Sequence, residues 1–434
     1  MTKRCFCGIL LSEAEGVIMR QNYSENLFRR EKYLGKLRGF YHEGEIIKVI
    51  TGVRRCGKSS IMKMIIAELI AQGVSKEHIL YFHLDKRPYA GVKKPEELDK
   101  LIEENSHVEG MKYLFIDEIQ NVRDFETVIN SWREEGDFSI FLTGSNSYLL
   151  SGELATKLTG RYLEFNILPL TLDEYVGIKR FFGKSVPTDP QTLLSEYILE
   201  GGFPYAAKLD TQADRRAYVT GLIDEIFQKD ISRRVKIKNR AVFDAVMTYI
   251  INNFGSTTSI DNIVEEFQKN RVSVKRETVS RYIKALESAK IILECDRFDM
   301  KSKKSLRGEK KYYLSDLSFY FAMNTDNRIN YGPALENIVY NYAFGKGYRI
   351  SVGRIGKLEC DFILRDDQLN YAYVQVAYTI LESKATEDRE YRSLEAITWD
   401  NYPRYVMTTD KMIQHRNGIR HENIVDFIMN DKTF

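Results

Sequence analysis

The chain has 434 residues, of which 43% are hydrophobic and 29% are charged. This length exceeds one ordinary core, so we expect two to four domains, and the composition excludes a disordered or fibrous protein. The most hydrophobic stretches, such as Ile46–Ile50 and Ile65–Ile70, each include one charged residue and are far shorter than the roughly 18 apolar residues needed to cross a bilayer, so we expect no membrane span. With a net charge of only +3, contact with nucleic acid would have to come from local basic patches.

The N-terminal residues and the cysteines indicate the compartment. Residues 1–16 carry two basic residues and a short apolar patch, but acidic residues follow and no signal-peptide cleavage site is recognisable. Of the five cysteines only Cys5 and Cys7 are close together, which favours reduced thiols over a zinc site. We therefore predict a cytoplasmic protein.

From residue 45 to 167, short apolar strands alternate with helical stretches. This pattern predicts an α/β fold with a parallel sheet wrapped by helices. The strands are hydrophobic along nearly their whole length, which predicts a sheet covered on both faces. The expected strands are Glu45–Thr51, Ile79–Leu84, Lys112–Ile116, Ser139–Thr143 and Tyr162–Ile167.

The remaining chain divides into three stretches. Leu168–Leu170 ends the alternating pattern, and residues 171 to about 240 are expected to be helical with an interruption at Gly201–Pro204. Three helices and a basic hairpin follow, up to about residue 316. The last stretch is expected to contain one helix and at least three strands. These helices and strands are expected at Ala241–Asn253, Ile260–Lys269, Val274–Ala289 and Pro333–Phe344, and at Tyr348–Gly353, Glu359–Leu364 and Tyr371–Tyr378.

Residues 52–59, GVRRCGKS, match the phosphate-binding pattern G-x-x-x-x-G-K-[ST] between a strand and a helix. Glycines let the backbone curl around phosphates, whose charge the amides and the helix N-terminus stabilise. Lys58 would neutralise the outer phosphates of ATP, and the Ser59 hydroxyl would hold Mg²⁺. The residues expected to contact the nucleotide are Gly52, Val53, Arg54, Arg55, Cys56, Gly57, Lys58, Ser59 and Ser60.

Two carboxylates, Asp117 and Glu118, follow the apolar run 113–116. In an open α/β sheet such residues emerge where ligands bind. Asp117 is expected to hold Mg²⁺, and Glu118 is expected to act as the general base toward water. Without the phosphate-binding loop, Asp117 and Glu118 could equally be the polar end of an ordinary strand.

The strand 139–143 ends in small polar residues, and here the sequence resembles the AAA+ ATPases. The resemblance implies a sensor residue at this strand end, which is Ser145 or Asn146, with Asn146 taken as the catalytic candidate. It also implies an arginine that reaches the nucleotide of a neighbouring subunit, which by position is Arg161. A surface salt bridge is the alternative role for Arg161.

More specifically, the chain resembles a bacterial and archaeal group of AAA+ superfamily ATPases with a C-terminal domain of unknown function. The resemblance covers nearly everything after about Met19. It implies an AAA+-like core at 27–169 after an N-terminal extension at 1–26, and a helical lid at 170–240, where Arg215 and Arg216 are candidates for touching the nucleotide. Arg54 and Arg55 match the group and could contact phosphate or another subunit. The motifs that carry the resemblance are GVRRCGKSS, FIDEIQ, LTGSN, LTGR, LPLTLDEY, GGFP, LENIVYNYAF, ECDFI and VQVAY.

Residues 241–316 resemble a winged helix-turn-helix. The helix 274–289 has one apolar side and one polar side, and basic residues crowd the hairpin after it. We expect residues 271–311 to bind double-stranded DNA, with contact to a protein partner as the alternative. The polar side of the helix carries Lys275, Arg276, Ser280, Arg281 and Lys284, and the hairpin carries Arg297, Lys301, Lys303, Lys304, Arg307, Lys310 and Lys311.

Residues 317–434 resemble a restriction-endonuclease-like α/β domain. In that fold an acid, a second acid and an (E/Q)-x-K motif gather around a divalent metal, and Glu336, Asp361 and Gln375 match this order. Ala377 stands where the lysine is expected, so we predict a domain without nuclease activity that binds DNA or a partner. Lys357 and Lys384 are conceivable substitutes for the lysine.

The leading hypothesis is an ATPase that converts ATP and water to ADP and phosphate and couples its nucleotide state to DNA or partner binding. One alternative is an ATP-regulated endonuclease, which the missing lysine weakens. Another is a nucleotide-dependent scaffold that does not hydrolyse ATP, against which Glu118 argues because a scaffold needs no general base.

Overall fold

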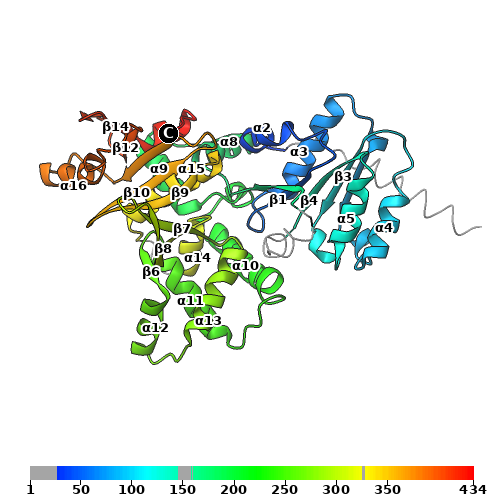
Figure 1. Ribbon diagram of the computed structural model, residues 1–434, viewed down its shortest axis with the longest axis horizontal. Coiled ribbons are helices and arrows are strands. Elements are labelled where there is room, and N and C mark those ends of the chain that lie inside the picture. The colour runs from blue at the N-terminus through cyan, green and yellow to red at the C-terminus, as the bar shows by residue number, and fades with distance from the viewer. Residues whose placement is uncertain (1–26, 145–157, 159, 325–327) are drawn as a thin grey trace, which may run out of the picture. The chain divides into compact units, whose positions relative to one another are not determined.

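The computed structural model describes residues 27–144, 158, 160–324 and 328–434 (Figure 1). The chain divides into two compact units. The first comprises Met1–Gly52 and Gly57–Ile167, and the second comprises Val53–Cys56 and Leu168–Phe434. Among the described helices, none combines the length and the apolar character that a bilayer crossing requires.

The first unit is built on a five-stranded sheet in which all neighbours are parallel, with the strand order β2-β3-β4-β1-β5. This confirms the predicted α/β fold, and the order fits a P-loop AAA+ core. Every residue of β1, β3 and β4 is buried, because helices cover these strands. The elements are α2 (Glu31–Arg38), β1 (Ile47–Thr51), α3 (Lys58–Ala71), β2 (Ile79–His83), α4 (Pro95–Glu103), β3 (Lys112–Asp117), α5 (Phe125–Glu134), β4 (Phe138–Thr143) and β5 (Tyr162–Asn166).

The fifth strand differs from the expectation of a sheet covered on both faces. β5 pairs with β1 alone and lies at the edge of the sheet, and none of its residues is fully buried. Leu163 is 37% exposed. The apolar residues of β5 predict a strand correctly, but the position of a strand at the edge or in the centre depends on the order of the whole sheet.

The second unit begins with helices that precede its sheet. Thr171, the N-cap residue of α8, donates its backbone N–H to the Glu174 carboxylate (3.2 Å), which explains the spacing in LPLTLDEY. A π-helical turn, η5, continues directly from α10. The helices before the sheet are α8 (Leu172–Phe181), α9 (Pro190–Glu200), α10 (Gln212–Ile226), η5 (Phe227–Ile231) and α11 (Arg240–Asn252).

The sheet of the second unit has nine strands in the order β13-β14-β12-β11-β10-β9-β7-β8-β6. The hairpin β7–β8 joins it because β7 pairs in parallel with β9, so one sheet extends across the expected boundary at residue 316. Helix α15 packs against β8–β11, and α16 packs against β10–β12 (Figure 1). The remaining elements are β6 (Thr257–Ser259), α12 (Ile260–Lys269), α13 (Arg276–Ser288), β7 (Ile292–Asp299), β8 (Lys304–Leu314), α14 (Ser318–Met323), α15 (Tyr331–Lys346), β9 (Arg349–Ile355), β10 (Leu358–Arg365), β11 (Tyr371–Val376), α16 (Lys384–Glu395), β12 (Arg404–Thr408), β13 (His415–Arg416), β14 (Ile419–Asn423) and α17 (Ile424–Met429).

Hydrogen bonds at Gly201–Gly202 connect the first helices of this unit to the rest of it. Gly202 accepts a hydrogen bond from the Leu170 N–H (2.7 Å) and donates its own N–H to the Asp316 carboxylate (2.7 Å). A Cβ atom on Gly202 would lie 2.2 Å from the Leu170 carbonyl oxygen, and Gly201 has a φ of +75°. Both positions therefore require glycine, one for space and one for backbone conformation.

Candidate active site

The phosphate-binding loop connects β1 to α3. Gly52 and Gly57 have φ angles of +146° and +111°, and Arg55 between them has a φ of +68°. The N-cap residue of α3 is Gly57, which has no side chain to satisfy the first helical amides, so these N–H groups can receive an anion. The Lys58 ammonium donates to the Gly52 carbonyl (2.9 Å) and so lies across the loop, where a phosphate could take over this contact.

Asp117 ends β3 at the same edge of the sheet, because β4 separates β3 from β1 and all three strands run parallel. Its carboxylate is fully buried. One oxygen accepts from the Thr143 hydroxyl at the end of β4, and the other accepts from the Tyr81 hydroxyl (3.0 Å). His83 Nε2 is 3.7 Å from the same carboxylate. These contacts fix the orientation of Asp117, as a metal-holding carboxylate requires.

Glu118 follows Asp117 with a φ of +63°, an unusual angle for a residue with a side chain. Its backbone N–H donates to Thr143 Oγ1 (3.1 Å), so this hydroxyl both donates to Asp117 and accepts from Glu118. The Glu118 carboxylate accepts a hydrogen bond from the Gln120 side chain. An oriented carboxylate at this position can receive a proton from a water molecule.

Sequence reasoning missed three residues of this site. Thr143 and Gln120 hold the acidic pair, and Tyr81 orients Asp117 from the neighbouring strand. Thr143 carried a usable signal, since it is a polar residue that ends a buried strand. The contact from Tyr81 depends on the pairing of β2 with β3 and has no local signal.

Arg30 was also missed. Its guanidinium Nη1 is 3.8 Å from the position that a Cβ atom on Gly57 would take, and its side chain stacks over the Tyr33 ring (4.6 Å). The residue is only 3% exposed, although it is an arginine. It adds a positive charge beside the phosphate-binding loop, at the start of α2.

The structure describes Arg161, the arginine predicted to reach a neighbouring subunit, but not the two candidates for the sensor residue. Ser145 and Asn146 lie outside the described residues, so the choice between them stays open. Arg161 lies just before β5; its carbonyl accepts the Ile47 N–H (3.0 Å), and its side chain is exposed. Among the described residues no hydrogen bond or ion pair of the Arg161 side chain is found, and both roles, the contact with a neighbouring subunit and the surface salt bridge, stay predictions.

Arg54 and Arg55 belong to the second unit and pair with carboxylates of the same unit. Arg54 makes a two-pronged contact with Asp230, at 2.9 and 3.0 Å. Arg55 donates to Glu225 at 3.0 and 3.3 Å. Glu225 lies on α10 and Asp230 on η5. Their contact with a nucleotide stays a prediction, which would require these arginines to exchange a carboxylate for a phosphate.

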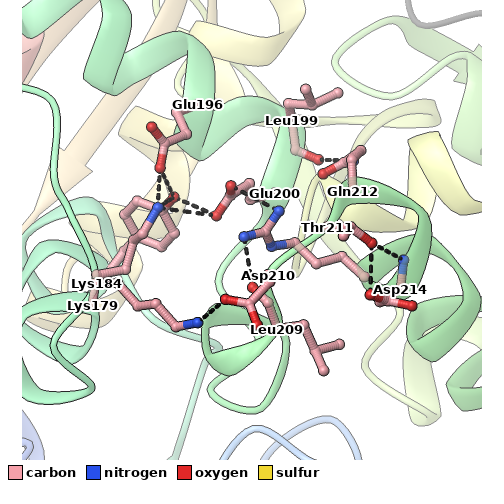
Figure 2. A network of polar contacts seen from close by, with 12 residues as sticks. Lys179, Lys184, Glu196, Leu199, Glu200, Leu209, Asp210, Thr211, Gln212 and Asp214 are labelled. Carbon is pink, nitrogen blue, oxygen red and sulfur yellow. Dashed lines mark hydrogen bonds and ion pairs between the residues drawn. The ribbon is translucent and has the colours of Figure 1, made fainter.

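Arg215 and Arg216, the two arginines predicted in the helical lid, also have partners within the second unit. Arg215 pairs with Glu200 (3.0 Å) and donates to the Leu209 carbonyl (2.7 Å), and it is buried. Figure 2 shows this surrounding network, in which Glu196 and Glu200 meet Lys179 between α8 and α9. Arg216 donates to the Asn324 carbonyl. Both side chains therefore stabilise the helices of the second unit, and their contact with a nucleotide stays untested.

The two carboxylates predicted for the nuclease-like site, Glu336 and Asp361, lie around a lysine together with Glu359, which was not predicted. Lys311 of β8 is 3.2 Å from Glu336 of α15 and 2.9 Å from Glu359 of β10. Burial disfavours the charged form of Lys311, but Glu336, Asp361 and Glu359 outweigh it and raise the pKa of this ammonium. Burial, with the charge of Glu336 next in size, raises the pKa of Asp361 well above its ordinary value. Lys311 therefore supplies a positive charge to this cluster from within the chain.

Gln375 makes its contacts elsewhere. Its amide bonds to Glu390 (3.2 Å) and Ser393 (3.0 Å), both on α16. Asp361 instead accepts the Val376 N–H (2.8 Å) at a bulge of β10. In the described part of the chain, no group of three or more His, Cys, Asp or Glu side chains has the arrangement of a metal site.

Two residues of the basic hairpin face inward, contrary to the expectation that they contact phosphates. Lys311 is 5% exposed, and Arg297 is 8% exposed and pairs with Glu309 and Glu359. Lys310 is half-buried and pairs with Glu294 and Asp296. The side chain of Arg307 lies outside the described residues. The basic residues that remain exposed are Lys301, Lys303 and Lys304 on the hairpin and Lys275, Arg276, Arg281 and Lys284 on or beside α13.

Comparison with known proteins gives two family matches. Residues 45–176 match the family described as AAA domain, and residues 191–329 match a domain of unknown function, DUF8612. An uncharacterized protein of Haemophilus influenzae is 33% identical over 409 residues, which cover 94% of this chain and 100% of that protein. An uncharacterized protein of Methanocaldococcus jannaschii is 28% identical over 358 residues, or 80% of this chain and 78% of that one.

Two solved structures are similar to parts of the chain. The Walker-type ATPase of Pyrococcus abyssi has a TM-score of 0.49 and 15% identity, and the match covers 69% of this chain and 97% of that one. The ORC1 protein of Aeropyrum pernix, solved with DNA, has a TM-score of 0.32 and 15% identity, with 71% and 96% covered. At these scores the strand order and the loop geometry carry the fold assignment.

Proposed function

Because the chain belongs to the same family as the full-length Haemophilus influenzae relative, and because its residues 45–176 form an AAA domain, we propose that it binds and hydrolyses ATP. The observation that carries this proposal is the pairing of an open phosphate-binding loop with an acidic pair at the same sheet edge. The hydroxyl of Thr143 links Asp117 to the backbone of Glu118, so the two acids are held as a unit.

Each residue of the site has a distinct task. The Lys58 ammonium and the first amides of α3 bind the outer phosphates. Ser59 and Asp117 suit Mg²⁺, since a hydroxyl and a fixed carboxylate are oxygen ligands of the kind it prefers. Mg²⁺ bound with ATP would neutralise charge on the transferred phosphoryl group. The Glu118 carboxylate, oriented by Gln120, receives the proton of the attacking water.

Two substitutions test the proposal and separate hydrolysis from mere binding. Lys58→Ala should abolish nucleotide binding and turnover together, because the outer phosphates lose their counter-charge. Glu118→Gln should keep binding but lower turnover by about 10²–10⁴-fold, since the amide cannot accept the proton. ATP binding by calorimetry and phosphate release measure the two effects. Wild-type turnover in Glu118→Gln would contradict the general-base role and favour a scaffold that does not hydrolyse ATP.

Arg161 is proposed to complete the site of a neighbouring copy. Its exposed guanidinium is available for such a contact. In the same turnover assay Arg161→Ala should leave ATP binding intact and lower turnover, and sedimentation with ATP should show an oligomer. A protein that stays monomeric and hydrolyses ATP normally would rule out this role.

We also propose that the second unit binds double-stranded DNA through α13 and the tip of the β7–β8 hairpin. The exposed basic residues on these two elements support this proposal, because the buried cations of the same region are already paired. Three helices followed by a hairpin are the parts of a winged helix-turn-helix, in which a helix enters the major groove. Nucleotide state in the first unit could then be coupled to DNA binding.

The salt dependence of duplex binding tests this role. Each neutralised phosphate should contribute roughly 0.9 to the slope of log affinity against log salt. The double variant Arg281→Ala/Lys284→Ala should lower the slope by about 0.9 for each phosphate that it no longer neutralises. Lys269→Ala, an exposed lysine at the end of α12, is the matched control. A flat salt response of the wild-type protein would favour a protein partner.

For the carboxylates around Lys311 we propose a structural ion-pair network that takes the place of a nuclease site. The support is that the ammonium of Lys311 and the guanidinium of Arg297 already balance Glu336 and Glu359. Incubation of the protein with supercoiled plasmid and Mg²⁺ or Mn²⁺ should leave the plasmid intact. Cleavage that Asp361→Ala abolishes would support the ATP-regulated endonuclease instead.

A further inference from the structure

A cavity of about 510 Å³ opens on the sheet of the second unit, and its lining includes none of the carboxylates around Lys311. Its volume lies within the roughly 300–1,000 Å³ that small-molecule sites have. Its floor consists of residues of β9, β10 and β11, strands labelled in part in Figure 1, and one wall is the loop between α16 and β12. The cavity is lined by Phe298, Met300, Lys303, Arg349, Ile350, Ser351, Ile363, Arg365, Tyr371, Tyr373, Trp399, Asp400 and Tyr402.

Two arginines lie side by side on the floor of this cavity. Arg349 of β9 and Arg365 of β10 are directly opposite each other in the antiparallel register. Like charges in this position repel and destabilise a sheet. Within the described part of the chain, neither side chain forms a hydrogen bond or an ion pair with an acidic residue. The fold therefore keeps a concentrated positive charge in the cavity, which an anionic ligand would balance.

Aromatic rings line the cavity beside the two arginines and form its wall. Tyr371 is opposite Arg365 on the next strand, and its ring centroid is 5.3 Å from that of Tyr402. Trp399 is 46% exposed and Tyr402 is 36% exposed, although both line the cavity. Large exposed aromatic side chains beside cations are typical of surfaces on which nucleobases stack.

One carboxylate also faces the cavity, and it has a structural role. Asp400 accepts the Tyr373 hydroxyl (2.7 Å) and the Tyr402 N–H (3.2 Å). These bonds hold the loop that carries Trp399 and Tyr402 against the sheet. Lys303 of the hairpin also lines the cavity, but Arg349 and Arg365 alone outnumber this single acid, so the cavity keeps an excess of positive charge.

We propose that this cavity, the arginine–aromatic pocket, binds a nucleotide of single-stranded nucleic acid. The phosphate lies between Arg349 and Arg365, and the base stacks on the aromatic wall. A strand fits better than a free nucleotide, because the exposed rings of Trp399 and Tyr402 extend the stacking surface to the mouth of the pocket, where the next base would follow. A duplex does not fit, since its bases are already stacked and paired.

Tryptophan fluorescence gives a direct test in the full chain. The chain has two tryptophans, and Trp132 lies in the first unit, where it donates to Asp99 (2.8 Å). In the variant Trp132→Phe, Trp399 is therefore the remaining reporter. An oligothymidine strand without ATP should quench this fluorescence. Duplex DNA and thymidine monophosphate at the same nucleotide concentration should leave it nearly unchanged. Quenching by the mononucleotide that equals quenching by the strand would overturn the assignment to a strand, and so would equal quenching by the duplex.

Substitutions in the pocket test the two halves of the proposal. Arg349→Ala/Arg365→Ala should remove the quenching and lower the salt slope of strand binding by roughly 0.7 for each phosphate that is no longer neutralised. Trp399→Leu, measured by anisotropy of a labelled strand, should weaken binding roughly 5- to 150-fold. Lys357→Ala, an exposed lysine in the turn between β9 and β10, should behave like the wild type. Quenching that persists without the two arginines, or a strand that fails to quench Trp399, would overturn the proposal.

The melting temperature separates an effect on binding from an effect on folding. Because Arg349 and Arg365 repel each other, Arg365→Ala should melt at the wild-type temperature or above it while binding the strand more weakly. A variant that melts lower and binds more weakly would indicate a structural role and contradict the pocket. The proposal does not depend on ATP hydrolysis, so Glu118→Gln should quench normally with the strand.

Discussion

Two groups of carboxylates in this chain differ in what balances their charge. Asp117 and Glu118 are held by neutral donors, namely the side chains of Tyr81, Gln120 and Thr143. In the described part of the chain, the basic group within ion-pair distance of this pair is the imidazole of His83, at 3.7 Å from Asp117. Around Glu336, Glu359 and Asp361, by contrast, Lys311 and Arg297 contribute full positive charges.

The difference indicates what each group can do. Neutral hydroxyl and amide donors orient a carboxylate and leave its negative charge available to a cation that arrives with a ligand. In a carboxylate cluster with its own buried ammonium, the negative charge is already balanced. The free-energy cost of removing these charges from water is offset only while every partner stays in place. The first arrangement suits a site that binds and releases a metal with nucleotide, and the second suits a permanent connection between β8, α15 and β10.

Removal of the Lys311 ammonium should have the largest effect on the stability of the second unit. Lys311→Met leaves Glu336 without its ion pair and Glu359 with Arg297 alone, in a region that is mostly buried. Loss of one partner from a buried pair costs about 3–5 kcal/mol, so we expect the free energy of unfolding of the second unit to fall by about that amount. Urea denaturation followed by circular dichroism measures it.

A neighbouring lysine provides the control for this prediction. Lys304 lies on the same strand and is exposed, so Lys304→Met should change the stability by no more than about 0.5 kcal/mol. Lys311→Arg keeps the charge and should recover part of the stability. If Lys311→Met were as stable as Lys304→Met, the carboxylates would have another source of balance, and the contrast with Asp117 and Glu118 would disappear.

The first unit was largely predictable because its signals are local. Each strand is a short apolar run that ends in polar residues, and the loop at 52–59 matches a fixed pattern between a strand and a helix. The position of Asp117 followed from the end of its own strand. Thr143 and Tyr81, however, reach Asp117 across strand pairings, and the order β2-β3-β4-β1-β5 cannot be seen in any one segment.

The second unit shows why other interactions were missed. The sequence suggests a solvated basic hairpin at 297–311, but β7 pairs in parallel with β9, and this long-range pairing buries Arg297 and Lys311. Gln375 was expected beside Glu336 and Asp361 because their order in the chain resembles that of the restriction-endonuclease-like fold. The register between β9 and β10 shifts between Cys360 and Ile363, and such a bulge breaks the alternation that a two-residue period predicts.

The protonation of Asp361 gives the smallest but most specific effect. Burial, followed by the charge of Glu336, raises the pKa of Asp361 in the folded protein, whereas the unfolded chain has the ordinary value near 3.8. The folded state then keeps a proton that the unfolded state releases, so the stabilisation from this group is complete below about pH 4 and declines as the pH rises through the higher folded pKa.

Asp361→Asn is neutral at every pH and retains an oxygen that can accept the Val376 N–H, so its stability advantage over the wild type should grow with pH by up to about 1.4 kcal/mol per unit within that window. A series of urea titrations of Asp361→Asn and the wild type across pH measures this trend. A constant difference between Asp361→Asn and the wild type would mean that Asp361 is ionised in the folded protein, and its carboxylate would then be as available to a cation as that of Asp117.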